Sequence, residues 1–532
     1  MDIENETIIY NINSNKIYQQ LESNSLIVYP KNSNNILKKN FELNSTEIEC
    51  FTIILNILKK YNLNTTCRIA GGWVRDKLLG KESDDIDIAL NDMKGSKLAS
   101  LINEELYPGK DKVGIIQQNA KKGKHLETAT IKICKVWIDF VNLRCENDNE
   151  IGTPLSDAEL RDLSINSLFY NINEKKVEDF TNKGIKDLEN GIIETPIKAE
   201  ITFRHDPLRI LRMLRFAIKY KFKIGDDINN CIEKNKEEYL EQFYNNISAE
   251  RIEKELYKIL NMENSAYAIA YLYSYNLLDI IFLIKKFDSK YNFDNIFIKI
   301  VNLYILGEYL YEKIKIFNSE ITSDNFSKID YSLLLLTLYF RQFKIGKKDT
   351  MNTLILKNTY KTGNEYIKQN KIMAQYFDEL TSLINSQTYE RLPIGKLLRK
   401  LLYKNIIPSL LASIAYEYIE KMNLNSIIDN INENILNDII EKNKKFYDFI
   451  KNENMMHIDE MKPLFSGQDI MQILNIKPGS EIGILVECLI EEQIKKDKYS
   501  KDEAKEFLIN KKEELANKNP NNKKKKDKNK NK

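Results

Sequence analysis

The sequence predicts an α+β fold, in which a small mixed β-sheet near the start of the chain is followed by an all-helical remainder. Short apolar stretches that alternate like strands lie between residues 67 and 144, and a glycine pair joins the first of them to a helix. From about residue 263 to residue 460, Tyr, Leu and Ile recur at the helical spacing of three and four. At 532 residues the chain is too long for one core, so we expect three or four domains.

Composition favours a soluble globular protein, with 42% hydrophobic and 30% charged residues. No apolar run reaches the roughly 18 residues that a membrane span needs. The first residues lack the order of a signal peptide, and Asp2, Glu4 and Glu6 argue against a transit peptide. We therefore expect a cytoplasmic or nuclear protein without membrane association, and leave an organellar location open.

Cysteine and charge patterns exclude two further classes. The six cysteines form no CxxC pair, so neither a zinc site nor a disulfide framework is expected. The net charge is +3, and residues 517–532 hold eight Lys and one Asp, or +7, which leaves −4 on the rest. RNA binding would therefore depend on local basic patches and on this lysine-rich end.

The first ordered elements predict a binding site for phosphate. Ser45 is expected to cap a helix in which Phe51, Ile54, Leu55 and Leu58 recur at helical spacing, after a polar and loosely ordered start. A strand at residues 67–70 leads into Gly71 and Gly72, where the backbone can turn sharply and approach a ligand. The next helix, from Trp73 to Gly80, points its free N–H groups at the same spot.

A pair of aspartates follows this helix. Side chains alternate along a strand, so Asp85 and Asp87 share one face of the strand at residues 85–89, about 6.5 to 7 Å apart along it. Strands disfavour Asp, and two carboxylates beside a phosphate site suggest Mg²⁺. The alternative is a surface strand with solvated aspartates.

The run from residue 69 to residue 90 resembles the signature of the class II tRNA nucleotidyltransferase (CCA-adding enzyme) and poly(A) polymerase family, roughly GGxVRDxLLGxxxxDxD. Eukaryotic CCA-adding enzymes are the members it resembles most. The resemblance implies a nucleotidyltransferase head, catalytic and Mg²⁺-binding roles for Asp85 and Asp87, and nucleotide binding by Gly71, Gly72 and Arg75.

Two later stretches extend the head. Residues 128–144 are expected to form two strands, and Asp139 stands where polymerases of this superfamily often place a third carboxylate for metal. An edge-strand Asp139 paired with Arg144 is the alternative. A helix from about Ser156 is expected to carry a pattern, RDxSxNSLFYN, that resembles the motif of the family for ribose and phosphates, which implies nucleotide binding by Arg161, Asp162 and Asn166. Leu160 replaces the first Arg of that motif.

The segment that follows resembles the neck of the family. Residues 177–196 match a third motif, read mainly as a hinge, with Glu194 where members often carry Arg. A helix expected over residues 203–222, starting near His205 or Asp206, resembles the DxxR motif that reads the base of the incoming nucleotide. This implies nucleotide binding by Asp206, Arg209 and Arg212. A solvated basic helix face is the alternative.

Ser248 is expected to cap the next helix, over residues 247–260, and the remainder is predicted as helical body and tail. The expected domains are a loosely ordered extension at 1–40, the head at 41–172, the neck at 173–262, the body at 263–460, a helical tail at 461–510 and a disordered lysine-rich end at 511–532.

The resemblance implies template-free addition of C, C and A to the 3′ end of tRNA from CTP and ATP, with Mg²⁺ and release of pyrophosphate. The alternatives are a poly(A) polymerase or a partial CC- or A-adding enzyme, and, from another class, a non-catalytic RNA-binding protein on a polymerase-like head. No oligomeric state is predicted.

Overall fold

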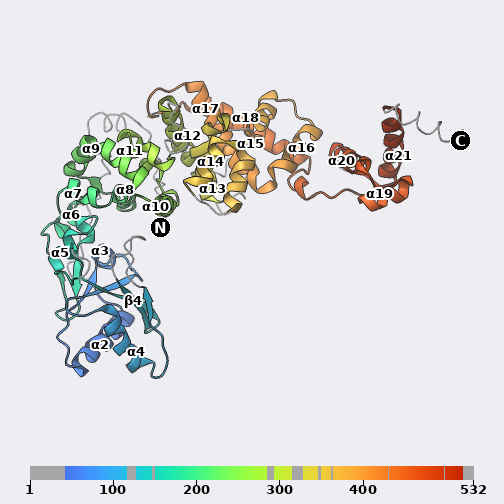
Figure 1. Cartoon of the computed structure of the whole chain (residues 1–532). Coiled ribbons are helices and arrows are strands. Elements are labelled where there is room, and N and C mark those ends of the chain that lie inside the picture. Colours follow the sequence, from blue (N-terminus) through green and yellow to red (C-terminus); the bar gives the residue numbers. More distant parts are fainter. Residues whose placement is uncertain are drawn as a thin grey trace, which may run out of the picture. The chain divides into compact units, whose positions relative to one another are not determined.

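A computed structural model describes residues 42–116, 127–146, 150–283, 293–313, 327–345, 349–360, 364–428, 430–496 and 498–518. The expected extension at 1–40 and the last residues, 519–532, lie outside this range. The chain divides into two compact units, one over residues 11–291 and one that contains residues 292–532 (Figure 1). No helix among the described residues is long and apolar enough to cross a membrane.

The first unit is built on a seven-stranded sheet in the order β3-β4-β5-β2-β1-β6-β7. The pair β2 and β5 is parallel and the other pairs are antiparallel, so the predicted mixed sheet is confirmed. The seven strands are β1 Cys67–Ala70, β2 Ile86–Leu90, β3 Gly114–Ile116, β4 Thr128–Ile133, β5 Val136–Asn142, β6 Phe169–Asn171 and β7 Lys176–Glu178.

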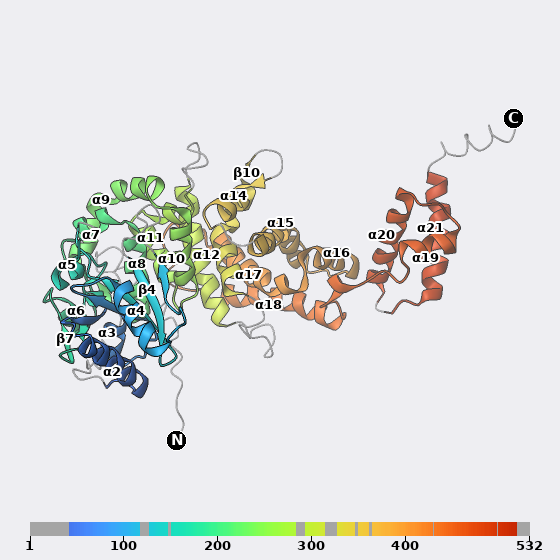
Figure 2. The same ribbon diagram turned by 60° about the horizontal axis from the view of Figure 1, so that its bottom comes forward.

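Three helices support this sheet: α2 Ser45–Lys60, α3 Gly72–Leu78 and α4 Gly95–Leu106 (Figure 2). Asn44, and not the predicted Ser45, caps α2, because its side chain accepts from Glu47 N at 2.9 Å. The helix α3 ends as predicted just before Gly80, whose φ of 72° suits a glycine after a helix. Trp73 of α3 is 1% exposed and packs into the core.

The helix expected to carry Arg161, Asp162 and Asn166 is shorter than predicted. The helix α5 spans Pro154–Glu159, and a short 3₁₀ turn, η2, covers Ser164–Asn166. The Asp162 carboxylate accepts from Leu163 N at 3.0 Å and from Asn166 Nδ2 at 2.9 Å. These local bonds to backbone and side chain compete with helix continuation.

The neck elements follow the sheet in the same unit. The single helix predicted over residues 203–222 is two helices that meet at Asp206 and Pro207, because a residue before proline is driven to extended backbone, here φ −155° and ψ 98°. The elements are α6 Gly184–Asn190, β8 Ile192–Ile193, α7 Ala199–His205, α8 Leu208–Tyr220, β9 Lys223–Ile224, α9 Asp226–Asn245, α10 Ala249–Leu260, α11 Ala266–Ser274 and η3 Leu278–Ile281.

The second unit is helical, as predicted, apart from one two-stranded pair, β10 with β11, that the sequence did not indicate. Its helix α21 runs to Lys518, so helix continues beyond residue 510, where disorder was predicted. The elements are α12 Asp294–Glu312, α13 Lys328–Thr337, η7 Leu338–Gln342, β10 Lys344–Ile345, β11 Asp349–Thr350, α14 Met351–Asn358, α15 Asn364–Ser386, α16 Arg391–Leu401, η8 Tyr403–Asn405, α17 Ile406–Met422, α18 Glu433–Asn452, η9 Ile458–Glu460, α19 Gly467–Leu474, α20 Ser480–Lys495 and α21 Lys501–Lys518.

Candidate active site

Gly71 forms the turn between β1 and α3 with φ 76° and ψ −118°. Its N–H donates to the carbonyl of Leu168 at 2.9 Å, which ties the turn to the next part of the head. A Cβ built on Gly71 would lie 2.5 Å from Arg161 Nη1. The turn therefore brings its backbone directly against a guanidinium group, an arrangement that only glycine allows.

Arg161 is held at this turn by a buried carboxylate. Its Nη2 donates to Asp157 Oδ2 at 2.9 Å and its Nη1 to the Asn166 carbonyl at 3.3 Å. Asp157 is 2% exposed and also pairs with Arg144. Burial opposes the charged form, but Arg161 and Arg144 hold the pKa of Asp157 below its ordinary value. Arg161 Nε is buried without a hydrogen-bond partner, so part of the positive group is unsatisfied.

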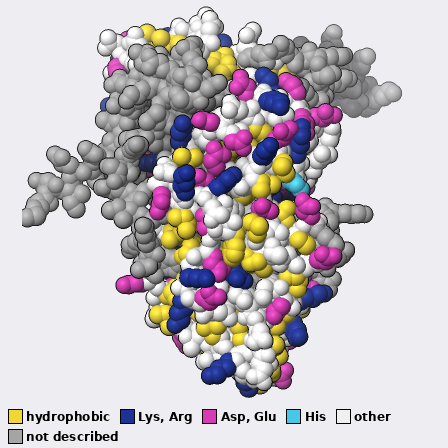
Figure 3. Space-filling model, turned by 90° about the vertical axis from the view of Figure 1, so that its left-hand side faces the viewer, with side chains coloured by type: hydrophobic (Ala, Val, Ile, Leu, Met, Phe, Trp, Pro, Cys, Tyr) yellow, Lys and Arg dark blue, Asp and Glu magenta, His cyan; other side chains and the backbone are white. Residues whose placement is uncertain are grey.

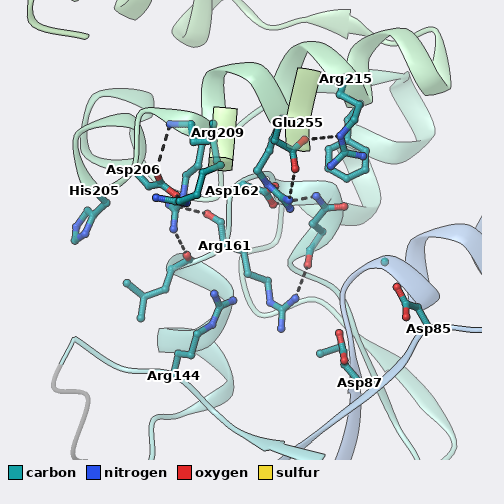
Figure 4. A pocket seen from close by; sticks show the side chains of 18 of the residues that line it. Asp85, Asp87, Arg144, Arg161, Asp162, His205, Asp206, Arg209, Arg215 and Glu255 are labelled. Carbon is teal, nitrogen blue, oxygen red and sulfur yellow. Dashed lines mark hydrogen bonds and ion pairs between the residues drawn. The ribbon is translucent and has the colours of Figure 1, made fainter. Parts of the chain in front are cut away.

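Asp85 and Asp87 lie on one side of this turn, both solvent-exposed at the cleft (Figure 4). The parallel register of β2 and β5 sets Asp87 opposite Asp139. Desolvation in the cleft and the negative charges of Asp139 and Asp85 raise the pKa of Asp87 to about 6. The positive charges of Arg161 and Arg144 act against this shift. Clustered carboxylates that raise each other's pKa are the oxygen ligands that a hard divalent cation prefers.

Asp139 faces the same side as Asp87, but its alternative assignment is wrong. The strand β5 lies between β2 and β4, so it is not an edge strand. Asp139 Oδ1 accepts from Thr130 Oγ1 at 2.5 Å, while Arg144 pairs with Asp157. Among the residues the structure describes, no set of three His, Cys, Asp or Glu side chains forms a closed metal cage. Asp85 and Asp87 therefore lie at the cleft with Asp139 near Asp87, and the structure itself does not group them into a metal-binding set.

Arg75 and Asn166 form a buried link next to the Gly71 turn. Arg75 is 4% exposed and donates to Asn166 Oδ1 and, at 3.0 Å, to Asp76 Oδ1. Its guanidinium also lies 4.8 Å from the ring centres of Phe216 and Tyr220 in the neck. Arg75 borders the cleft but directs its donors into the protein, so it orients Asn166 in this structure.

The predicted base-reading residues are engaged with protein groups. Arg209 donates to the carbonyl of Leu160 at 2.6 Å and to that of Arg161 at 3.3 Å. Asp206 Oδ2 accepts from Arg251 Nη2 at 2.6 Å. Asp206 precedes α8, so it is not on the same helix as Arg209, contrary to the prediction.

Arg212 connects the neck to the head. Its Nη2 lies 2.7 Å from Asp162 Oδ2, and its Nη1 lies 3.5 Å from Glu255 Oε1. Arg215, one turn further along α8, donates to Glu255 Oε2 at 2.8 Å. Burial opposes ionisation of Asp162, but Arg212 and Asn166 hold its pKa well below the ordinary value.

All of the predicted catalytic and nucleotide-binding residues except Gly71 and Asp139 line one cavity of about 1720 Å³ in the first unit. Sequence reasoning missed Asp157, and it did not identify the partners of Arg251 and Glu255. The spacing of Asp157 and Arg161 by four residues was a signal for their ion pair, but the sequence did not show which residues of the neck α10 would contact. On the face drawn in Figure 3, Lys and Arg side chains alternate with Asp and Glu and form no continuous basic band.

Comparison with known proteins adds sequence evidence. A family model described as the poly A polymerase head domain matches residues 67–194, and one described as a probable RNA and SrmB-binding site of polymerase A matches residues 221–288. The chain is 33% identical over 485 residues to a Candida glabrata protein named CCA tRNA nucleotidyltransferase, mitochondrial, covering 81% of this chain and 90% of the relative.

Two further similarities span most of the chain. It is 33% identical over 503 residues to the tRNA nucleotidyltransferase cca1 of Schizosaccharomyces pombe, with coverage of 88% of this chain and 97% of the relative. A solved structure of a CCA-adding enzyme in an apo form matches with a TM-score of 0.61 and 19% identity over 88% of this chain and 96% of that one. The structural match supports the fold, and the sequence matches extend through both units.

Proposed function

The chain belongs to the family of the CCA tRNA nucleotidyltransferases, and from this premise we propose how its cleft adds C, C and A to the 3′ end of tRNA. The substrates are CTP, ATP and tRNA, the product besides the extended tRNA is pyrophosphate, and no nucleic-acid template takes part. One observation carries the proposal. The aspartate pair, Gly72 and Arg161 beside the Gly71 turn, and the neck arginines all line one cleft.

We assign the triphosphate to the Gly71 turn. The N–H groups at the start of α3 point toward it, and Arg161 adds a donor fork with a buried, unpartnered Nε. Asp162 and Asn166 would meet the ribose hydroxyls, an interaction that distinguishes ribose from deoxyribose. Leu160 replaces the first arginine of this motif, and its carbonyl accepts a hydrogen bond from Arg209. Arg161 is therefore the one arginine of the motif.

Enzymes of this kind generally depend on a metal ion, and we propose Mg²⁺ held by Asp85 and Asp87, with Asp139 beside them. When bound, such an ion neutralises phosphate charge and makes the attacking hydroxyl more acidic. The 3′ oxygen of the tRNA forms a bond to the α-phosphorus while the bond from that phosphorus to pyrophosphate breaks. The hydroxyl proton leaves to solvent. Because the 3′-hydroxyl of the tRNA is itself the nucleophile, no protein nucleophile is needed.

Base selection requires an exchange of hydrogen bonds. Asp206 is occupied by Arg251, and Arg209 by the carbonyls of Leu160 and Arg161. A cytosine or adenine edge offers both donors and acceptors, so it can satisfy Asp206 and Arg209 in place of these partners, while the 39% exposed Arg251 side chain is left to solvent. We propose that Asp206 and Arg209 turn to the base when nucleotide enters, and that Arg212 keeps Asp162 in place.

The division of the chain into head, neck and helical remainder suggests a role for each part. We propose that residues 41–172 carry catalysis, that residues 173–262 read the base, and that the helical remainder binds tRNA. Two relatives are named as mitochondrial, and the expected cytoplasmic or nuclear location of this chain stays a prediction.

Incubation of the purified protein with tRNAs that end before, within and after CCA, with CTP, ATP or both, tests the function. Sequenced products should gain only the residues missing from CCA and then stop. Long A tails would indicate a poly(A) polymerase, and products that stop after CC or accept only A would indicate a partial enzyme. RNA binding without incorporation would indicate a non-catalytic protein.

A further inference from the structure

Trp137 of β5 is 58% exposed, more than any other large hydrophobic side chain in the described part of the chain. It lines the active-site cleft. An exposed indole gives up the burial that stabilises most tryptophans, so its position on a cleft wall indicates a ligand with an aromatic or apolar face.

The sheet fixes where this indole lies. Trp137 precedes Asp139 by two residues on β5, so both side chains are on the face that carries Asp87. The register pairs Ile86 with Ile138 and Asp87 with Asp139, and neighbouring strands lie about 4.8 Å apart. Trp137 therefore lies on the face of Asp87 and Asp139, and it lines the same cleft as Asp85 and Asp87.

Reaction geometry decides which substrate reaches this point. In phosphoryl transfer the attacking and leaving oxygens lie roughly in line on opposite sides of the phosphorus. The proposed triphosphate site is at the end of β1, Asp87 is on β2 with Asp85 just before that strand, and Trp137 is on β5, in that order across the sheet. Pyrophosphate leaves toward β1, so the attacking 3′-hydroxyl comes from the β5 side.

We propose that Trp137 stacks on the 3′-terminal base of the RNA acceptor and so positions the attacking hydroxyl; this rests on the proposed function. Lys132, paired with Trp137 across β4 and β5, has its Nζ 5.6 Å from the indole centre and adds positive charge for the adjacent phosphate. A stacking surface accepts any base, which suits an enzyme whose acceptor end changes after each addition.

The incoming nucleotide is the competing occupant. Its base, however, belongs near Asp206 and Arg209 if its phosphates bind at Gly71, and those residues come from the neck. Trp137 and Lys132 are on β5 and β4, which lie on the other side of β2 from β1 and the Gly71 turn. We therefore assign the acceptor end, and not the incoming base, to the β5 side of the cleft.

Intrinsic fluorescence tests the stacking directly. The chain has two tryptophans, and the other one, Trp73, is 1% exposed. An acceptor-stem RNA hairpin with a single-stranded 3′ end should quench the full-length protein, and the same hairpin with a blunt end should quench it much less. The Trp137→Phe protein, which retains Trp73 alone, should show no such difference. Quenching by CTP without RNA, or equal quenching by both hairpins, would overturn the proposal.

Kinetics with the full chain provide the second test. Trp137→Ala should lower kcat/KM for tRNA by roughly 5- to 150-fold, the effect of losing about 1 to 3 kcal/mol of base stacking. Its KM for CTP at saturating tRNA should not change, and Trp137→Phe should recover much of the loss. Ile115→Ala, which removes a side chain that is 50% exposed on β3 of the same sheet, is the matched control and should behave as wild type.

The two hypotheses fail in different ways. If the wild-type protein adds CCA but Trp137→Ala keeps its kcat/KM for tRNA, the stacking role is wrong and the proposed function stands. If the wild-type protein adds no nucleotide to tRNA, the proposed function is wrong, and the stacking role fails with it.

Discussion

Asp162 and Arg212 form an ion pair between the head and the neck, with 2.7 Å between Oδ2 and Nη2. Asp162 is 7% exposed, so its charge depends on this partner. Asp162→Asn should lower the free energy of unfolding by about 3 kcal/mol, because it leaves the Arg212 charge without its main partner. Urea denaturation at neutral pH measures this. Asp226→Asn is the control, because that side chain is 81% exposed, and an equal effect of the two changes would contradict the role of the pair.

The carboxylates of Asp85 and Asp87 should be needed for chemistry more than for RNA binding. Either Asp→Asn change should abolish nucleotide incorporation while leaving tRNA affinity nearly unchanged, since binding depends mainly on basic contacts elsewhere. Filter binding and single-turnover incorporation separate the two quantities. Asp92→Asn removes the same charge from an exposed position just after β2 and should retain activity. Near-normal turnover in the Asp85 or Asp87 variant would refute the metal assignment.

Arg209 should affect both stability and nucleotide choice. Arg209→Ala removes donors from the Leu160 and Arg161 carbonyls, so the melting temperature should fall. UTP and GTP should also compete better, with a roughly 5- to 150-fold loss of selectivity if the base contact contributes about 1 to 3 kcal/mol. The measurement is kcat/KM for all four nucleotides in the folded variant.

Arg215→Ala is the matched control for that experiment. Arg215 lies on the same helix and donates to Glu255 within the neck. Its loss should lower stability and leave the ratio of nucleotides unchanged. An unchanged ratio in the Arg209 variant would mean that Arg209 only holds the backbone of the head.

Glu194 should make stability depend on pH. It packs over Gly225, and burial, with the charges of Asp227 and Asp187, raises its pKa to about 7. The folded state then binds the proton more tightly than the unfolded state, whose Glu has a pKa of about 4.5. The contribution of Glu194 to the free energy of unfolding is therefore fully present at low pH. It is lost as pH rises from about 4.5 to about 7, which lowers the free energy of unfolding by roughly 1 to 3 kcal/mol.

Two variants isolate this effect. Glu194→Gln should reduce the pH dependence in that window, leaving the part due to other groups such as Asp87, and raise the melting temperature at pH above about 7. Glu194→Arg restores the residue expected from the family resemblance and should stabilise further, by pairing with Asp227 and Asp187. Thermal melts at several pH values provide the measurement, and a wild-type curve that is flat across the window would contradict the assignment.

Sequence reasoning located elements better than contacts. The strand before Gly71 and the strand that carries Asp87 depend on local alternation, which a sequence displays directly, although this second strand begins at Ile86 and Asp85 lies just before it. The break before Pro207 and the short helix α5 were missed, because Asp206 and Asp162 have local backbone preferences that override the apolar periodicity.

Partners across elements could not be predicted. Arg209 and Arg251 both read as basic residues on amphipathic helices, and nothing local distinguishes one that binds a carbonyl from one that pairs with Asp206. Trp137 read as one residue of a strand pattern. Its exposure depends on the neighbouring strands and on the open side of the sheet, which are properties of the tertiary fold.

Gly71 and Gly72 are adjacent glycines, but the structure allows different substitutions at the two positions. A side chain at Gly71 would be strained and would strike Arg161 Nη1, whereas one at Gly72 would meet Arg75 Nη2 at an ordinary 3.5 Å. In a saturation library selected for folded protein, position 71 should therefore return glycine alone and position 72 should also return alanine. Gly71 is therefore required by the fold itself. A requirement for glycine at position 72 would instead come from the bound ligand.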